Sequence, residues 1–189
     1  MIAMPAPKGR SGAGRTPSRV FARGLAPVLP RDARVLVLGS FPGVASLAAR
    51  AYYAHPRNHF WPLIGTILGE PLAALPYAER IVRISARGIA LWDTIVACER
   101  EGSSDGSIRR AERAEAARVR RASPAIELVA FNGGTAARAA PRWRDAGYET
   151  VVLPSTSPAY TRPFAEKLAA WRVLERWLAE GRARPRGPP

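Results

Sequence analysis

Cysteine and histidine are scarce in this sequence, and their scarcity limits the chemistry available to it. The single cysteine, Cys98, excludes a disulfide within the chain and is consistent with a reducing cytoplasm. With His55 and His59 it leaves too few soft ligands for a structural zinc ion or an iron–sulfur cluster. No stretch of 18 or more apolar residues is present, and the basic N-terminal segment lacks the apolar core of a secretory signal. We therefore expect a cytoplasmic protein that has no membrane span, metal or cofactor.

Acidic residues are also few in comparison with basic ones. The chain has 15 Asp and Glu against 29 Lys and Arg, which gives a formal net charge of +14. Such an excess suits a polyanionic partner, because Lys and Arg displace condensed counterions from phosphates. A compositional bias towards Ala, Arg and Pro is the alternative explanation, and much of the charge lies near the chain ends, at Lys8, Arg10, Arg15, Arg19, Arg23, Arg182, Arg184 and Arg186. The charge favours nucleic acid as the partner and leaves the chemistry open.

The length and the hydrophobic content suffice for one domain with short tails. The chain has 189 residues, of which 47% are hydrophobic. Residues 1–30 are rich in Gly, Ala, Pro, Ser and basic residues without hydrophobic periodicity, which predicts a disordered basic arm. Residues 181–189 predict a disordered basic tail for the same reason. The folded domain is expected at residues 31–180.

Short, continuous apolar runs alternate with helical stretches along this domain. The runs at 35–38, 89–92, 126–131 and 150–153 are typical of strands buried on both faces. Helices are predicted at 60–68, 77–87, 108–121 and 134–140, and a last helix begins near Thr161. This order predicts an α/β three-layer sandwich with a four-stranded parallel sheet and right-handed crossovers.

Ligands bind beyond the carboxyl ends of the strands in such a sheet, and the unusual residues of this sequence cluster there. Residues 39–43 follow the first strand, Asp93 and Thr94 the second, residues 132–134 the third and residues 154–158 the fourth. The first loop, Gly-Ser-Phe-Pro-Gly, is neither a phosphate loop nor a dinucleotide fingerprint, because no Gly-Lys-Ser/Thr follows it and its glycine spacing differs. By itself it predicts only a tight turn.

Two further segments give these loops a chemical character. Residues 52–61, Tyr-Tyr-Ala-His-Pro-Arg-Asn-His-Phe-Trp, combine aromatics that stack on bases, an Asn that can hold a base or water, and an Arg that can bind phosphate. Phe60 and Trp61 are equally explained as core residues at the start of a helix. Residues 153–160, Leu-Pro-Ser-Thr-Ser-Pro-Ala-Tyr, form a stiff loop whose small side chains leave the backbone amides open to a phosphate or the minor groove. An ordinary connection that caps the last helix is the alternative.

Together these motifs resemble the DNA-deoxyinosine (hypoxanthine-DNA) glycosylase family of the uracil-DNA glycosylase superfamily. The resemblance rests on GSFPG, YYAHPRNHFW, LWDTI followed by CEREGS, FNGGTA and LPSTSPAY, in the family's order over residues 35–177. It implies a four-stranded parallel sheet flanked by helices. It also implies a monofunctional glycosylase of base excision repair that flips a deaminated base, hypoxanthine, out of DNA and hydrolyses its N-glycosidic bond. We expect a monomer, with DNA containing deaminated bases as its partner.

The resemblance also assigns roles to individual residues. Mismatch-type relatives place a water-positioning Asn where this chain has Phe41, whereas the deoxyinosine family relies on the Asn of His-Pro-Arg-Asn, which is Asn58 here. His55 is a second candidate catalyst, or it orients the loop. The expected base-binding residues are Gly39, Ser40, Phe41, Pro42, Gly43, Tyr53 and Asp93, with Tyr53 stacking on the base. The expected DNA-binding residues are Arg57, Pro154, Ser155, Thr156, Ser157, Pro158 and Tyr160.

Other functions remain open on the sequence alone. The base-reading Asn of uracil enzymes has no counterpart in residues 90–93, which argues against strict uracil specificity, although a uracil- or mismatch-specific enzyme is the nearest alternative. The loss of Asn at residue 41 also permits a catalytically inactive DNA-binding module on the same fold. A lyase step through a Schiff base is not expected, because no lysine lies in these motifs.

Overall fold

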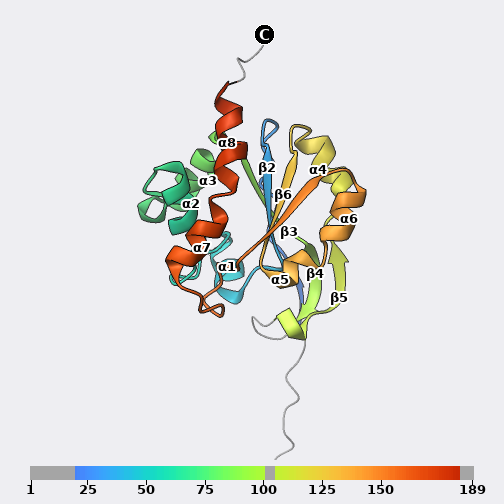
Figure 1. Cartoon of the computed structure of the whole chain (residues 1–189). Helices are drawn as coiled ribbons and strands as arrows, with labels where there is room; N and C mark the ends of the chain where they lie inside the picture. The colour runs from blue at the N-terminus through green and yellow to red at the C-terminus, as the bar shows by residue number, and fades with distance from the viewer. Residues whose placement is uncertain (1–19, 101–104, 184–189) are drawn as a thin grey trace, which may run out of the picture.

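A four-stranded parallel sheet forms the centre of the protein. The computed structural model describes residues 20–100 and 105–183. The sheet has the strand order β3-β2-β6-β7, with β2 at Val35–Gly39, β3 at Ile89–Asp93, β6 at Leu128–Asn132 and β7 at Glu149–Leu153 (Figure 1). Every residue of β2 and β3 is buried, as expected for strands covered on both faces. The predicted α/β class and the four parallel strands are confirmed.

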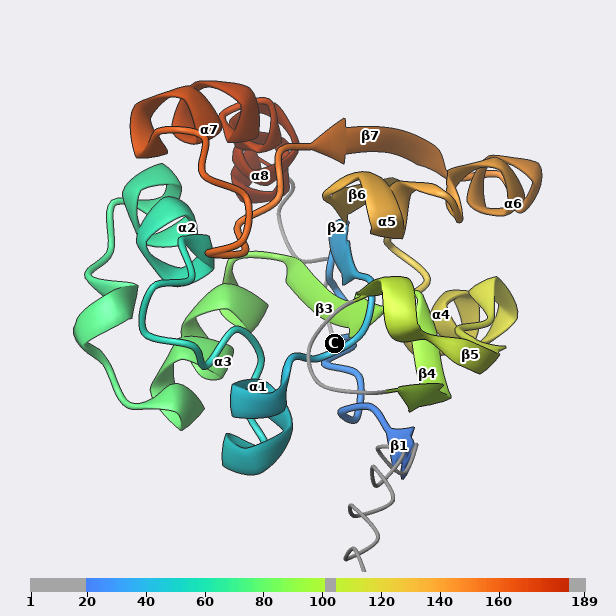
Figure 2. The same cartoon turned by 90° about the horizontal axis from the view of Figure 1, so that it is seen from below.

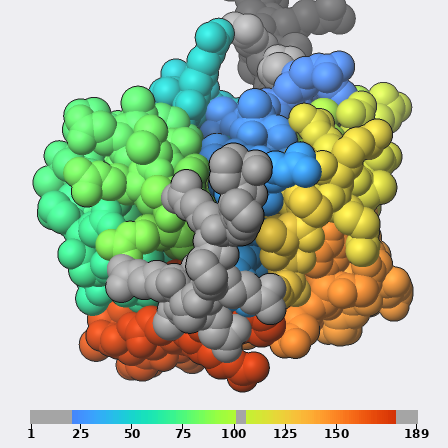
Figure 3. All heavy atoms as spheres, turned by 90° about the horizontal axis from the view of Figure 1, so that it is seen from above, coloured from blue at the N-terminus to red at the C-terminus, as the bar shows by residue number. Residues whose placement is uncertain are grey.

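Helices cover both faces of the sheet. Side chains of β2 point alternately to the two faces, so this strand contributes to a separate core on each side. Val35 and Val37 pack into one core with helices α2 (Phe60–Leu68), α3 (Tyr77–Ala86), α7 (Phe164–Trp171) and α8 (Leu174–Ala183). Leu36 and Leu38 pack into a second core with α4 (Ala116–Ala122), α5 (Gly134–Ala137) and α6 (Ala140–Asp145). Figure 3, seen from above, shows the early part of the chain in blue between the green α3 side and the yellow α4 side. None of the helices in the described parts of the chain is long and apolar enough to cross a bilayer.

A second, antiparallel sheet lies beside the first, and its strands contradict two of the predictions made from the sequence. It contains β1 (Val20–Arg23), β4 (Ile95–Arg100) and β5 (Arg109–Arg113) in the order β1-β4-β5. The helix predicted at 108–121 is therefore wrong in its first half, because pairing with β4 overrides the helical propensity of an Ala-, Arg- and Glu-rich segment. Only its second half is helical, as α4.

The folded part also begins earlier than residue 31. Residues 20–23 pair with β4, the backbone N–H of Gly24 donates to the carbonyl of Val96 at 2.8 Å, and Val28 pairs with Leu91 at the edge of β3. The prediction of a disordered arm is therefore wrong for residues 20–30, while residues 1–19 lie outside the described part. At the other end α8 continues to Ala183, so residues 181–183 are helical, and residues 184–189 lie outside the described part.

Two predicted helices are each divided in the structure. The segment predicted at 134–140 forms the short helix α5 and then the start of α6. The last helix begins at Phe164, after Pro163, and is interrupted between Trp171 and Leu174. The short helix α1 (Val44–Ala49) follows the first loop and ends at Arg50, which has a left-handed conformation.

Candidate active site

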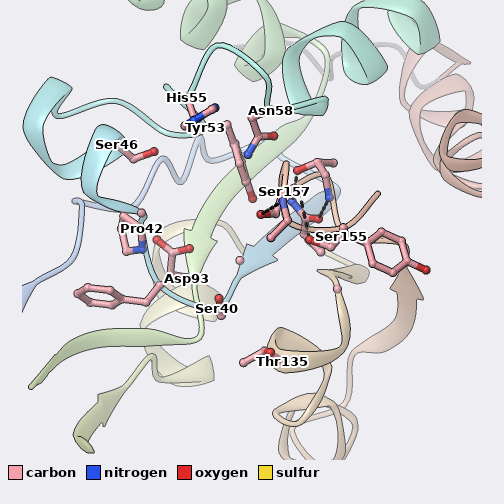
Figure 4. A pocket seen from close by; sticks show the side chains of 18 of the residues that line it. Ser40, Pro42, Ser46, Tyr53, His55, Asn58, Asp93, Thr135, Ser155 and Ser157 are labelled. Atoms are coloured by element: carbon pink, nitrogen blue, oxygen red, sulfur yellow. Dashed lines mark hydrogen bonds between the residues drawn. The ribbon is translucent and has the colours of Figure 1, made fainter. Parts of the chain in front are cut away.

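The carboxyl edge of the parallel sheet encloses a cavity of about 1000 Å³. The loops that follow all four strands line it, at residues 39–46, Asp93, residues 132–135 and residues 155–160, and Tyr52, Tyr53, His55 and Asn58 complete the wall. Figure 2 looks onto this edge of the molecule from below, and Figure 4 shows the side chains around the cavity. The structure thus brings together most of the predicted site residues. Pro154 and Arg57 are not among the lining residues, and Arg57 is exposed.

Gly39 and Asp93 stand side by side at the floor of the cavity, as register partners at the ends of β2 and β3. A Cβ added at residue 39 would lie 2.3 Å from Asp93 Oδ1 and 3.5 Å from the hydroxyl oxygen of Tyr53. The side chain of Asp93 is almost completely enclosed, with 5% of the residue exposed. Because glycine has no Cβ, the carboxylate of Asp93 and the hydroxyl of Tyr53 can both approach the backbone at residue 39.

Tyr53 presents an aromatic surface to the cavity from an unusual backbone conformation. Its φ of 56° is left-handed, which for a residue other than glycine is often found at functional sites. One face of its ring stacks on the fully buried Phe60, with the ring centroids 3.9 Å apart and the planes inclined by 21°. Burial and the neighbouring carboxylate of Asp93 raise the pKa of Tyr53, so its hydroxyl stays protonated. Tyr53 also lines the cavity, as expected for a residue that stacks on a base.

The turn from His55 to Phe60 fixes the orientation of Asn58. Its backbone N–H donates to the carbonyl of His55 at 2.8 Å, and the N–H of Phe60 donates to Asn58 Oδ1 at 3.0 Å. This second bond identifies the oxygen end of the amide and leaves Nδ2, on the side of Tyr53 in Figure 4, as a donor for the cavity. His55 Nδ1 accepts the N–H of Arg57 at 3.1 Å, so a neutral His55 ring carries its proton on Nε2.

The loop at 154–160 is fastened to three other parts of the chain. Thr156 donates its N–H to Asn132 Oδ1 at 2.8 Å and accepts Asn132 Nδ2 at its hydroxyl at 2.9 Å, while its carbonyl accepts the N–H of His59 at 3.0 Å. From α7, Trp171 donates to the carbonyl of Pro154 at 2.9 Å and Lys167 to that of Tyr160 at 2.7 Å. Hydrogen bonds along its length therefore restrain the shape of the loop.

These contacts divide the loop residues predicted to bind DNA into two groups. Thr156 is only 1% exposed and its polar groups bind other parts of the protein, so it holds the loop and is not presented on the surface. Ser155, Ser157, Pro158 and Tyr160 line the cavity together with Thr156 but, unlike it, are not buried, and Tyr160 is 39% exposed. Asn132 was not assigned a role from the sequence, although its place at the end of the third predicted strand was a signal that could have identified it.

Phe41 and Arg100 connect the cavity loop to the antiparallel sheet. Phe41 is 6% exposed and packs with Ile95 and Cys98. The guanidinium carbon of Arg100 lies 4.7 Å from the Phe41 ring centroid, and Arg100 Nη2 donates to the carbonyl of Pro42 at 2.7 Å. The residue that stands in place of the expected water-positioning Asn thus fills a small core of its own. This contact also explains part of the Cys-Glu-Arg-Glu-Gly-Ser motif, to which the sequence assigned no role.

Fold and cavity together define an α/β enzyme whose site lies at the carboxyl edge of a parallel sheet. Residues 26–178 match the family model described as the Uracil DNA glycosylase superfamily, and the chain belongs to this superfamily. It is accordingly a DNA glycosylase, an enzyme that hydrolyses N-glycosyl bonds in DNA repair. The family and the fold expected from the sequence motifs are both confirmed.

Two curated relatives and one solved structure are similar over most of the chain. The hypoxanthine DNA glycosylase of Methanosarcina barkeri is 36% identical over 149 residues, which are 79% of this chain and 94% of the relative. The hypoxanthine DNA glycosylase of Methanosarcina acetivorans is 36% identical over 157 residues, 83% of this chain and 99% of the relative. A solution NMR structure from Methanosarcina acetivorans, described as a candidate uracil DNA glycosylase, superimposes with a TM-score of 0.78 at 35% identity and covers 85% of this chain and 99% of that chain.

Proposed function

We propose that this DNA glycosylase releases hypoxanthine from DNA, as a monofunctional, cytoplasmic monomer without metal or cofactor. The observation that carries the choice of base is the 36% identity to two relatives named hypoxanthine DNA glycosylase, which extends over most of this chain. The size of the cavity, about 1000 Å³, and the absence of an amide side chain at residue 93 also favour a purine over uracil.

The polar groups of the cavity match the edge of hypoxanthine. Hypoxanthine presents a donor at N1–H beside an acceptor at O6, whereas adenine presents an acceptor and a donor at the same two places. Asp93 supplies an acceptor and Asn58 Nδ2 a donor, both in the wall of the cavity. A purine that stacks on the ring of Tyr53 is accepted when its edge has the hypoxanthine pattern. Adenine in the same place would leave buried polar groups unpaired.

The reaction is a hydrolysis in which the C1′–N9 bond breaks, a water oxygen bonds to C1′ and the released base takes up a proton. Negative charge develops on the departing base, so a fixed donor aimed at it lowers the barrier. Asn58 Nδ2 serves as this donor. The engagement of Asn58 Oδ1 by the N–H of Phe60 supports donation to the base over orientation of water through the oxygen. His55 Nε2 is a second donor in the wall of the same cavity.

Single-turnover release from matched duplexes tests the proposal. The duplexes carry hypoxanthine, uracil, xanthine or only normal bases in one sequence context. We expect hypoxanthine to be released faster than uracil, and adenine not at all. Asp93→Asn, which replaces one acceptor oxygen by a donor, should slow the release of hypoxanthine. Faster release of uracil by the unchanged protein would assign the chain to the uracil-specific enzymes.

A further inference from the structure

Three arginines that form no ion pair within residues 20–100 and 105–183 lie at or near the wall of the cavity. Arg138, which follows α5, is exposed and belongs to the cavity wall, and no hydrogen bond or ion pair of its side chain is found within residues 20–100 and 105–183. Its charge therefore faces the solvent at the cavity entrance.

Arg142 and Arg113 extend the positively charged region from Arg138 towards the antiparallel sheet. Arg142, on α6, is half-buried and donates from Nη2 to the carbonyl of Ala114 at 2.9 Å and towards that of Thr94 at 3.5 Å. Thr94 in turn donates its N–H to the carbonyl of Gly39 at 2.8 Å, which places Arg142 next to the cavity floor. Arg113 is the exposed last residue of β5, directly before Ala114. Burial, with Arg113 as a nearby like charge, lowers the pKa of Arg142.

Several other arginines in the described part of the chain are paired with acidic residues, although not all of them are. Arg34 pairs with Glu127 at 2.9 Å, Arg87 with Glu70 at 2.5 Å and Arg110 with Glu99 at 2.9 Å. No such ion pair involves Arg113, Arg138 or Arg142 in the described part of the chain. Like charges held together without counter-charges oppose folding, and a polyanion that binds across them removes this cost.

We propose that Arg113, Arg138 and Arg142, here called the arginine edge, bind backbone phosphates of the DNA strand whose base enters the cavity. Arg138 belongs to the cavity wall, so phosphates close to an extruded nucleotide of that strand come within its reach. The arginine edge uses other residues than the loop at 154–160 and Arg57, and its elements α5, α6 and β5 lie towards the same side of the molecule in Figures 1 and 2. The inference rests on the DNA glycosylase activity and does not depend on which base is released.

The salt dependence of DNA binding tests the arginine edge. The variant combines Arg113→Gln and Arg138→Gln, which remove two exposed charges that make no hydrogen bond in the described structure. Each lost phosphate contact lowers the slope of log K against log salt by about 0.9 for duplex DNA. Arg31→Gln is the matched control, because Arg31 is exposed and lies in the turn before β2, at the opposite edge of the sheet. We expect the double variant to lose slope and the control to keep the slope of the unchanged protein. Equal slopes in all three proteins, or equal losses in both variants, would overturn the proposal.

Duplexes that carry a single methylphosphonate linkage identify which DNA strand the arginine edge contacts. Each linkage replaces one charged phosphate within a few nucleotides of the lesion, on either strand. A neutral linkage on the lesion strand should weaken binding by the unchanged protein at one or two positions and have a smaller effect on the double variant, which keeps only Arg142 of the arginine edge. The same interaction on the opposite strand alone would contradict the proposal. The salt dependence is measured on an undamaged duplex as well as on a hypoxanthine duplex, so a failure to release hypoxanthine would refute the proposed substrate and leave this binding result readable.

Discussion

The carboxylate of Asp93 lies against the Cα of Gly39, so that a Cβ at residue 39 would come within 2.3 Å of Asp93 Oδ1. The two residues are 54 positions apart in sequence and meet because β2 and β3 are parallel neighbours in register. The floor of the cavity is thus made by Gly39, which has no side chain, and by the carboxylate of Asp93, which occupies the space that a side chain at residue 39 would fill.

Gly39→Ala should displace this carboxylate and impair both folding and base release. Real Cβ atoms do not approach an oxygen this closely, and overpacking of this kind typically costs about 1–3 kcal/mol. Urea unfolding measures the loss. Gly134→Ala is the control for stability, because a Cβ there meets nothing within 4 Å. If the clash is the cause, Asp93→Ala in the Gly39→Ala background should restore stability without restoring base release. An unchanged stability of Gly39→Ala would refute this geometry.

Asn58→Asp should separate the two possible roles of the amide. The carboxylate keeps the acceptor for the N–H of Phe60 and loses the donor that faces the cavity. We expect a stability close to that of the unchanged protein and at least about tenfold slower single-turnover release of hypoxanthine. Asn58→Ala should be equally slow and also less stable by about 1–3 kcal/mol, because the N–H of the buried Phe60 loses its acceptor as well. Full activity of Asn58→Asp would mean that the side-chain oxygen at residue 58, by positioning a water, is the catalytically important group.

Substitutions of Tyr53 test the aromatic surface. Tyr53→Phe should be mild, since it keeps the ring face and its contact with Phe60. Tyr53→Ala should slow base release by about 5- to 150-fold, because stacking of a base on an aromatic ring contributes about 1–3 kcal/mol. The rates are compared below the melting temperature of the weaker variant. Equal damage from both substitutions would show that the hydroxyl is the important group.

Stability should decrease on acidification through His59. Burial, with the charge of Lys167 in addition, lowers the pKa of His59 below its usual value of 6.5. Below about pH 6.5 the unfolded chain therefore binds a proton that the folded state resists, and the free energy of unfolding falls until the folded-state pKa is passed. Urea unfolding at a series of pH values measures this. His59→Gln should have a flatter pH dependence below 6.5, and two parallel curves would exclude His59 as the source.

Removal of residues 1–19 should flatten the salt dependence of DNA binding without abolishing base release. The segment carries Lys8, Arg10, Arg15 and Arg19, and each phosphate contact contributes about 0.9 to the slope. Removal of residues 1–30 should instead destabilise the protein, because it also deletes β1 and the pairing of Val28 with Leu91. An unchanged slope after the shorter deletion would mean that this segment does not meet DNA.

The sequence by itself determined the central sheet, helix α2 and the place of the site. Strands buried on both faces need continuous apolar runs, and the runs found at four places became the four parallel strands. The predicted helix at 60–68 has the bounds of α2. Because the carboxyl ends of parallel strands share one edge, four loops far apart in sequence could be placed around one cavity in advance.

Only the tertiary structure decided how distant segments pair. Residues 109–113 have a helical composition and form a strand because β4 lies beside them. Asn132 and Thr156 fasten the last loop across 24 residues, and Arg100 reaches Pro42 across 58. Such contacts depend on which side chains meet in space, and neither local propensity nor periodicity contains that information. The same holds for Phe41, whose apolar side chain at a site of expected catalysis is explained by the small core that it fills.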